Sequence, residues 1–236
     1  KLPTKHDERL GVPSIRLEAQ IYKRLGHHER IIKCLSDRED LVDLEYAPNG
    51  HVQDYLKAHP DASDAFRLRV VQESTEAVAF IHSKGVIHSD LAARQLLLDA
   101  DLHVKLCDFG FSAFEGTEEI GFENYRHWLP RDSVSSSVKS DLFALGSTIY
   151  EIVAGEEPYK DKEDQEVEAL FRKGIFPDVS GFLCGNVISG CWDGRFNNAA
   201  EILPEITLQD STPVYSMIQY WFVRAKSVFQ LLFARA

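Results

Sequence analysis

The stretch that decides the fold is His88-Ser89-Asp90-Leu91-Ala92-Ala93-Arg94-Gln95, followed further along the chain by Asp108-Phe109-Gly110. The two aspartates are 18 positions apart (108 − 90). Two short apolar runs lie between them, at 96–98 and 104–107, and the turn that joins these runs predicts a pair of strands. One aspartate in a loop is usually explained by turn or cap chemistry. Two aspartates at this spacing, each beside a strand, instead indicate a site that carries chemistry.

These segments resemble the catalytic loop and the metal-binding loop of eukaryotic protein kinases, which read H-R-D-L-x-x-x-N and D-F-G. The resemblance covers roughly residues 1–197. It implies a bilobal, protein-kinase-like fold of the α+β class, with a small N-lobe and a mainly helical C-lobe. No G-x-G-x-x-G precedes Glu18, and the chain begins at Lys1. We therefore expect a divergent kinase domain that is truncated at its N-terminus, with an incomplete N-lobe.

The hydrophobic pattern independently predicts an α+β arrangement, because a helix and short strands precede several helices. Helices are predicted over 14–25, 52–58, 65–83 and 140–154, and strands over 31–35 and 41–46. Ser14 is expected to cap the first helix, with Pro13 ending the loop before it. Ser140 or Asp141 is expected to cap the helix that runs to residue 154. The irregular polar stretch 111–137 predicts a functional loop.

We expect one kinase-like domain over residues 1–236, made of a partial N-lobe (1–47), a C-lobe (48–213) and a C-terminal helix (214–236). The apolar residues of the last segment lie largely on one helical face. Arg224 and Lys226 interrupt that face, which argues against a membrane-spanning helix. The segment is expected to pack on the C-lobe. A helix that contacts a membrane surface or a partner is the alternative.

The composition is that of a soluble globular protein, with 44% hydrophobic and 27% charged residues. The net charge of 26 − 37 = −11 argues against a nucleic-acid-binding protein, since phosphate backbones attract surfaces rich in Lys and Arg. A nucleotide needs only a local cationic pocket. The four cysteines show no C-x-x-C spacing, and no N-terminal apolar stretch resembles a signal peptide. We therefore expect reduced thiols in an intracellular, cytoplasmic protein.

The resemblance implies roles in phosphoryl transfer for residues of the two loops. Asp90 would orient the acceptor hydroxyl and take its proton, a role that suits a carboxylate in a tight loop. Asp108 would hold Mg²⁺, a hard cation that prefers carboxylates and phosphate oxygens. Gln95 stands where the family has the second metal ligand, and Arg94 would balance charge on the transferring phosphoryl group.

Residues nearer the N-terminus would hold ATP. Glu18 resembles the helix glutamate that pairs with a strand lysine on the α- and β-phosphates, although an ordinary exposed glutamate is the alternative. Only Lys1 lies far enough upstream to be that lysine, and an arbitrary chain end is an equal alternative for it. Residues 41–49 resemble the hinge strand, so Glu45 and Ala47 would offer backbone groups to the adenine edge.

Two residues depart from the family pattern. Ser89 replaces the arginine that receives an activation-loop phosphate in many kinases, and serine cannot make the bidentate contact of a guanidinium. Gln95 replaces asparagine, and its extra methylene displaces the amide oxygen by roughly 1–1.5 Å. Magnesium tolerates little misplacement around its ~2.1 Å bonds. Weakened use of metal and nucleotide is the expectation.

Two later segments resemble further motifs of the family, and the second resemblance is loose. Asp141 resembles the D-x-W-S-x-G aspartate, which would tie the backbone of the catalytic loop to the central helix. Pro130-Arg131-Asp132 is a loose match to A-P-E, with Asp132 in place of the glutamate that anchors the loop. Arg195 is the candidate for the late arginine that pairs with that glutamate.

The sequence therefore predicts a protein kinase that transfers the γ-phosphoryl of ATP, with Mg²⁺, to a protein hydroxyl. Leu91-Ala92-Ala93-Arg94 and Cys191-Trp192 favour tyrosine as the acceptor, but the loose A-P-E match does not, so serine or threonine is the default. The alternative is a pseudokinase, a binding or scaffolding module with a kinase fold. A related small-molecule phosphotransferase is the third possibility.

Overall fold

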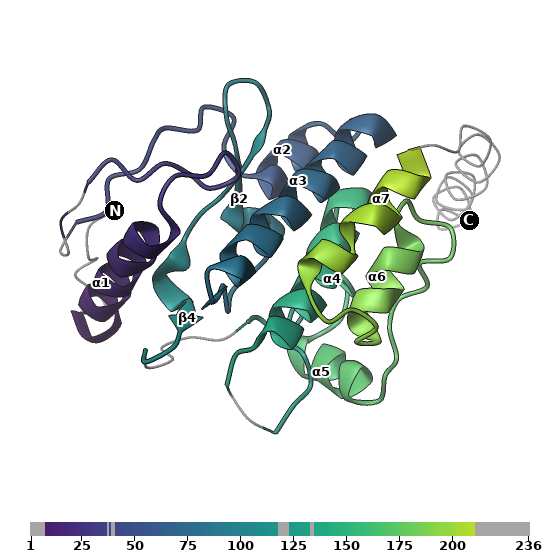
Figure 1. Cartoon of the computed structure of the whole chain (residues 1–236). Coiled ribbons are helices and arrows are strands. Elements are labelled where there is room, and N and C mark those ends of the chain that lie inside the picture. The colour runs from purple at the N-terminus through teal and green to yellow at the C-terminus, as the bar shows by residue number, and fades with distance from the viewer. Residues whose placement is uncertain (1–7, 37, 39–40, 118–122, 133–134, 211–236) are drawn as a thin grey trace.

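Two buried helices, α3 (Asp64–Ser83) and α4 (Val138–Ala154), form the centre of the molecule and pack against each other. The computed structural model describes residues 8–36, 38, 41–117, 123–132 and 135–210. Figure 1 shows α1 at one end of this part of the chain and α6 and α7 towards the other. The expected 214–236 helix and Lys1 lie outside the described residues. The mixed architecture, with small sheets and a helical larger part, confirms the predicted α+β class.

The cap of helix α4 lies three residues before Ser140, the earlier of the two predicted caps. Ser137 is the cap residue, and it exchanges hydrogen bonds with Ser140 at the third position of the helix. The prediction of Ser140 or Asp141 as cap was wrong, because this reciprocal capping box satisfies the first amides. Asp141 is thereby free to point away from the helix end. Gly155, at φ 79°, ends the helix in the left-handed conformation that glycine adopts without strain.

Three further helices surround α4 and α3. They are α5 (Asp164–Arg172), α6 (Gly185–Trp192) and α7 (Leu203–Asp210). Helix α6 packs closely on α4, since a Cβ at Gly146 would lie 2.6 Å from Cys191 Cβ. Trp192 Nε1 donates to Ser147 Oγ at 3.0 Å, so the one polar atom of this buried ring is satisfied. Helix α7 packs on α3.

Two small antiparallel sheets carry the two motif segments. Strand β1 (Val86–Ile87) enters the first motif and pairs with β4 (Ala113–Phe114), which leaves the second motif. Strands β2 (Leu96–Leu98) and β3 (Val104–Leu106) lie between the motifs and pair with each other, Leu96 opposite Leu106. This register confirms the predicted strand pair. It also brings the end of one motif beside the start of the other.

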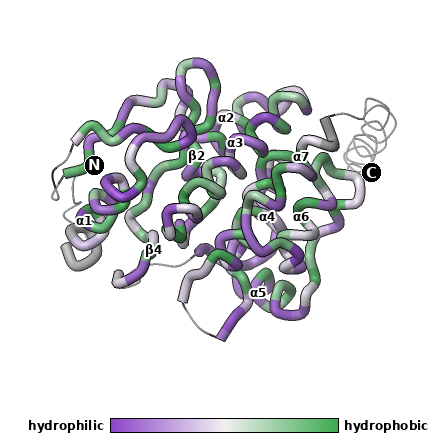
Figure 2. The backbone as a smooth tube through the Cα atoms, viewed as in Figure 1, coloured by the Kyte–Doolittle hydropathy of each residue, from purple (hydrophilic) through white to green (hydrophobic). Residues whose placement is uncertain are grey.

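Helix α1 (Glu8–Leu25) starts earlier than predicted and contains Pro13. The proline lies in the second turn, where its missing N–H removes only one hydrogen bond, so the helix continues through it. Apolar and polar residues alternate along α1 (Figure 2), and its apolar side is buried. The buried residues of that side include Ile15, Leu17, Ile21, Tyr22 and Leu25.

The two predicted strands of 31–46 lie side by side but form only isolated bridges within the described residues. Cys34 is opposite Leu44 in an antiparallel bridge, and Leu35 N donates to Asp43 O at 2.7 Å. The short helix α2 (Val52–Ala58) follows the turn after them. The apolar pattern of 31–46 therefore predicted strands where the described residues form only isolated bridges.

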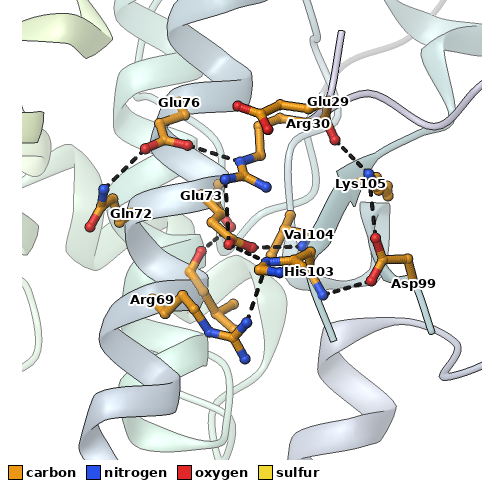
Figure 3. Close-up of polar contacts among 12 residues, drawn as sticks. Glu29, Arg30, Arg69, Gln72, Glu73, Glu76, Asp99, His103, Val104 and Lys105 are labelled. Carbon is orange, nitrogen blue, oxygen red and sulfur yellow. Dashed lines mark hydrogen bonds and ion pairs between the residues drawn. The ribbon is translucent and has the colours of Figure 1, made fainter. Parts of the chain in front are cut away.

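A polar cluster joins the loop after α1 to α3 and β3 (Figure 3). Arg30 Nε donates to Glu76 Oε2 at 2.9 Å, and Arg30 Nη2 lies 3.5 Å from Glu73 Oε1. Glu73 is buried, and its carboxylate also accepts from Val104 N at 2.8 Å and contacts His103 Nδ1 at 2.6 Å. Each oxygen of this buried carboxylate therefore has a partner, as burial of a charge requires.

Candidate active site

The first motif is anchored by Asp141 of α4. Asp141 is fully buried, and its two oxygens accept from His88 N at 2.7 Å and Ser89 N at 3.0 Å. His82 Nε2 contacts the same carboxylate at 2.9 Å. Burial raises the pKa of Asp141, but the His82 contact and the motif amide outweigh it, so the pKa lies below its usual value. The ionised carboxylate thus fixes the backbone of the motif, as the sequence predicted.

A second carboxylate of α4, Glu151, holds the other end of the motif. Its Oε2 accepts from Ala93 N at 2.8 Å, and the residue is 4% exposed. Ten residues separate it from Asp141 (151 − 141), close to three helical turns, so both point from one side of α4. The sequence analysis missed Glu151. An acid within a strongly apolar helix, at whole-turn spacing from Asp141, was the signal that could have found it.

Asp90 is held by two neighbours on its own loop. The Arg94 guanidinium pairs with Oδ1, and Gln95 Nε2 donates to Oδ2 at 2.6 Å. A carboxylate only accepts hydrogen bonds, so the nitrogen of the Gln95 amide must face Asp90. The side chain of Asp90 is 13% exposed and that of Arg94 is 32% exposed. The structure therefore brings three predicted site residues into direct contact.

Asp108 is placed beside this group by the backbone of its neighbours. Cys107 N donates to Gln95 O at 2.9 Å. Asp108 itself adopts the left-handed conformation, φ 62° and ψ 64°, which is uncommon for a residue with a Cβ and is found at functional sites. The left-handed turn redirects the chain immediately after the buried strand β3. Asp90, Gln95 and Asp108 thus lie around one point where β1, β2 and β3 end or begin.

Helix α1 packs directly on the second motif. The ring of Phe109 is fully buried between Tyr22, at 5.2 Å between ring centroids, and His88, at 5.3 Å. A Cβ at Gly110 would overlap Ser14 Oγ, so only glycine allows this approach. Glu18, on the same helix, is fully buried. Burial and then the charge of Glu18 raise the pKa of the Tyr22 hydroxyl.

The predicted hinge residues lie on the segment that precedes α2. Glu45 N donates to Lys33 O at 2.9 Å, and Ala47 O accepts from Gly50 N at 3.3 Å. The turn is tied to the strand that follows the first motif, since Leu98 N donates to Gly50 O at 2.8 Å. Glu45 and Ala47 are therefore linked to the site through β2. Lys1, the other predicted nucleotide contact, lies outside the described residues.

The described part of the chain has two hollows of note. A small cavity of about 180 Å³ lies beside the first motif. Its lining includes Ala93, Glu151, Glu156, Glu157 and Lys160. A larger hollow of about 760 Å³ borders α1 and the 31–36 segment, and neither Asp90 nor Asp108 lines it. The small cavity, and not the large one, adjoins the chemistry.

Comparison with protein families assigns residues 1–198 to the family described as protein tyrosine and serine/threonine kinase. The match covers most of the 236 residues. The chain belongs to this family. The predicted kinase family membership is therefore confirmed, and this kinase domain carries Asp90 and Asp108 in the loops whose geometry is described above.

The kinase domain is similar to kinases of both acceptor classes. It is 29% identical over 181 residues to human mitogen-activated protein kinase kinase kinase 3, covering 70% of this chain and 28% of that protein. It is 26% identical over 189 residues to human receptor-interacting serine/threonine-protein kinase 1 (69% and 28%). It is 28% identical over 191 residues to mouse cytoplasmic tyrosine-protein kinase BMX (74% and 29%). The matches thus span less than a third of each relative.

The segment after the second motif is held by ion pairs of its own. Arg131 Nη2 lies 2.9 Å from Glu123 Oε2, and the Glu123 side chain is fully buried. Arg126 pairs with Asp164 of α5 and donates to Lys162 O at 2.6 Å. Asp132 is exposed, so its expected role as the anchor of this segment was wrong. The pair Glu123–Arg131 lies within the segment, next to the exposed Asp132.

Arg195 was the candidate for the late arginine that pairs with the A-P-E glutamate. Its Nη2 lies instead 2.8 Å from Glu205 of α7 and donates to Asn186 O at 3.0 Å. That expectation was therefore wrong as well, because the local acid on α7 is nearer.

The family generally uses ATP and Mg²⁺, and the residues present fit that group in part. Asp108 lies in the loop where a carboxylate could contact Mg²⁺ together with phosphate oxygens. Among the described residues, no group of three or more His, Cys, Asp or Glu side chains could hold a metal ion alone. The Gln95 amide is directed by its nitrogen to Asp90. Because the amide donates through its nitrogen, its oxygen can still face a metal ion, so both Asp108 and Gln95 could contribute to a magnesium site.

None of the helices in the described residues has the length and apolar character that a membrane span requires. All four cysteines are free thiols, and Cys107, Cys184 and Cys191 are buried. Burial raises the pKa of Cys184 to about 12 and raises that of Cys191 as well. These two thiols are therefore unreactive in the native state.

Proposed function

We propose that this kinase domain transfers the γ-phosphoryl of ATP to a hydroxyl of a protein. The proposed acceptor is serine or threonine, and tyrosine is the alternative. The observation that carries the proposal is the group formed by Asp90, Arg94 and Gln95. Its carboxylate is oriented through the 2.6 Å contact from Gln95 and lies beside the Asp108 turn. Phosphoryl transfer depends chiefly on such positioning and on charge stabilisation.

Each residue of the site has a role in this proposal. Asp90 accepts the proton of the acceptor hydroxyl, while Arg94 both orients Asp90 and offers positive charge near the transferring group. Asp108 would hold Mg²⁺, which when bound neutralises the phosphate oxygens. Glu18 is buried beside the same turn, where it would orient a phosphate-binding lysine. Lys1 is proposed for that lysine, and the Glu45–Ala47 backbone for the adenine edge.

The cavity beside Ala93 supports a protein acceptor. A volume of about 180 Å³ is too small for a nucleotide-sized ligand and suits one side chain. The carboxylates of Glu151, Glu156 and Glu157 line it, and one oxygen of Glu151 is buried without a hydrogen-bond partner. We propose that a basic side chain of the protein substrate enters this cavity. An intracellular setting, which the four free thiols support, suits such a substrate.

The second candidate function is that of a binding or scaffolding module. It is favoured by the same contacts, since Arg94 and Gln95 occupy both oxygens of Asp90. Both oxygens are thus engaged by side chains of the same loop, which leaves them less accessible to a substrate hydroxyl.

A binding and transfer experiment separates the two functions. The protein is first heated with and without Mg-ATP, and transfer of labelled phosphate to a mixed protein substrate is then measured, with Asp90→Asn as the control. The enzyme requires a rise in Tm with Mg-ATP and transfer that Asp90→Asn abolishes. A rise in Tm without transfer supports the binding module. No rise and no transfer would overturn the proposed function.

Gln95→Asn tests the role of the longer amide. Asparagine restores the shorter side chain of the family, and misplacement of about 1 Å can cost on the order of 100-fold in rate. The variant should therefore transfer phosphate faster than the wild type, with a lower Mg²⁺ requirement. An unchanged rate, with Mg-ATP binding intact, would show that Gln95 does not limit the reaction.

A further inference from the structure

The polar stretch 111–137 that follows the second motif is called the activation segment below. It places one histidine, His127, beneath the catalytic loop, which is the first motif. Its side chain is 1% exposed. Its Nδ1 lies 2.9 Å from Asn124 Oδ1, and the same oxygen accepts from Arg126 N at 3.0 Å. Because the Asn124 atom that accepts from Arg126 is the amide oxygen, it carries no hydrogen and can only accept. The hydrogen bond to the ring must therefore be donated by Nδ1. The other ring nitrogen is therefore the one that faces the rest of the site.

That second nitrogen lies next to a carboxylate. His127 Nε2 is 3.7 Å from Glu151 Oε2, an ion-pair distance and too long for a hydrogen bond. Both side chains are nearly fully buried, at 1% and 4% exposed, so the ring lies directly against this carboxylate. Burial raises the pKa of Glu151, but His127, the Ala93 amide and Arg94 outweigh it, and the pKa falls below its usual value.

Glu151 uses the same oxygen to hold the catalytic loop. Its Oε2 accepts from Ala93 N at 2.8 Å, and Ala93 directly precedes Arg94, which pairs with Asp90. A continuous series of contacts thus runs from His127 through Glu151 and Ala93 to Arg94 and Asp90. It is short, it is built from the described residues of three different segments, and its His127–Glu151 contact is buried.

The activation segment is not coupled to this loop through residue 89. Ser89 is fully buried and has no guanidinium with which to bind a phosphate. The segment is held instead by Glu123–Arg131 and by the contacts of Arg126 with α5, all of which form without phosphorylation. A different contact is needed to couple the position of the segment to the position of Asp90.

We propose that His127 is a positioning residue, which couples the activation segment to the catalytic loop by holding Glu151 under the Ala93 amide. The coupling needs no phosphate, and it takes the place of the arginine contact that Ser89 removes. Its effect on catalysis rests on the proposed kinase function. The contact itself exists whether or not phosphate is transferred, so the two can be tested separately.

The test measures hydrogen exchange at the Ala93 amide together with phosphate transfer. His127→Leu removes the ring nitrogen that faces Glu151, and His127→Gln keeps a side-chain N–H that can face it. His127→Leu should speed Ala93 exchange roughly 2- to 30-fold, the range of couplings between neighbouring segments. It should lower kcat more than it raises the KM for ATP, and His127→Gln should restore part of both.

His103→Leu is the matched control, because His103 forms a similar histidine–carboxylate contact with Glu73 on the far side of α3, at 2.6 Å. It should leave Ala93 exchange and kcat at wild-type values. Wild-type exchange at Ala93 in His127→Leu would overturn the proposal. So would an equal change in His103→Leu. If His127→Leu fails to fold, the exchange rate of the Ala93 amide in His127→Gln tests the proposal instead. That rate must be higher than in the wild type. Absence of transfer in every protein contradicts the proposed function, while the exchange result still decides this inference.

Discussion

The catalytic loop and helix α1 lie on two sides of Asp108, and different forces hold them. The loop is fixed by backbone N–H groups that donate to two buried carboxylates of α4, Asp141 and Glu151. Helix α1 is held mainly by packing, with Tyr22 against Phe109 and Ser14 against the glycine that follows. Charge-assisted hydrogen bonds fix direction, whereas packing tolerates small shifts.

This difference separates the acceptor side of the site from the nucleotide side. Asp90 lies on the loop that the central helix anchors through Asp141 and Glu151. The position of Glu18 depends on how closely α1 approaches the Phe109–Gly110 turn. The strand segments next to α1 form only isolated bridges within the described residues, which makes this side easier to displace.

Replacing Asp141 by alanine should have the largest effect on the loop side. The change leaves His82 and two amides of the catalytic loop without their acceptor in a fully buried position. Removing one partner of a buried ion pair costs about 3–5 kcal/mol. Urea unfolding should therefore show a loss of that size. Asp141→Asn keeps one acceptor and should lose less. A loss under about 1 kcal/mol for Asp141→Ala would contradict the anchoring role.

Much of this arrangement could be read from the sequence, because local patterns encode it. The spacing of Asp90 and Asp108 and the apolar runs between them predicted β2, β3 and the two loops. The Asp141 contact followed from a resemblance in the helix that carries it. These features depend on residues near one another in the chain or on a whole motif.

The features that sequence reasoning missed depend on contacts between distant segments. Glu151 and His127 are 24 positions apart (151 − 127), and neither belongs to a motif that the sequence analysis used. The nitrogen of Gln95 faces Asp90 because of the local fold, and its residue type alone suggested a metal ligand. The Glu123–Arg131 pair was missed because the sequence analysis considered only Asp132 as the anchor of this segment.

Gly110→Ala tests the packing on the α1 side. Its Cβ would overlap Ser14 Oγ, so α1 must move away from the turn. Overpacking of this kind costs typically about 1–3 kcal/mol, and urea unfolding measures the loss. Adding Ser14→Ala removes the atom that the new Cβ meets. The double variant should recover most of the lost stability. Equal stability of the single and double variants would show that the two residues do not limit this approach.

Acid should lower the stability that Asp141 contributes to the folded protein, by a smaller amount than these substitutions do. The pKa of Asp141 is lower in the folded protein than its usual value of about 3.9, so its contribution is complete above that pH. It fades as the pH falls through the lowered native pKa. Unfolding measured from pH 6 down to 3 should show a shallower loss in Asp141→Asn than in the wild type. Identical slopes would mean that Asp141 is not the group responsible.

Hydrogen exchange without nucleotide compares the two sides most directly. The amides of His88, Ser89 and Ala93 donate to buried carboxylates, so they should exchange more slowly than the amides of residues 31–46. This result would show that α4 sets the catalytic loop in advance of ATP. Exchange at those three amides as fast as in 31–46, or slow exchange that appears only when Mg-ATP is added, would contradict the account.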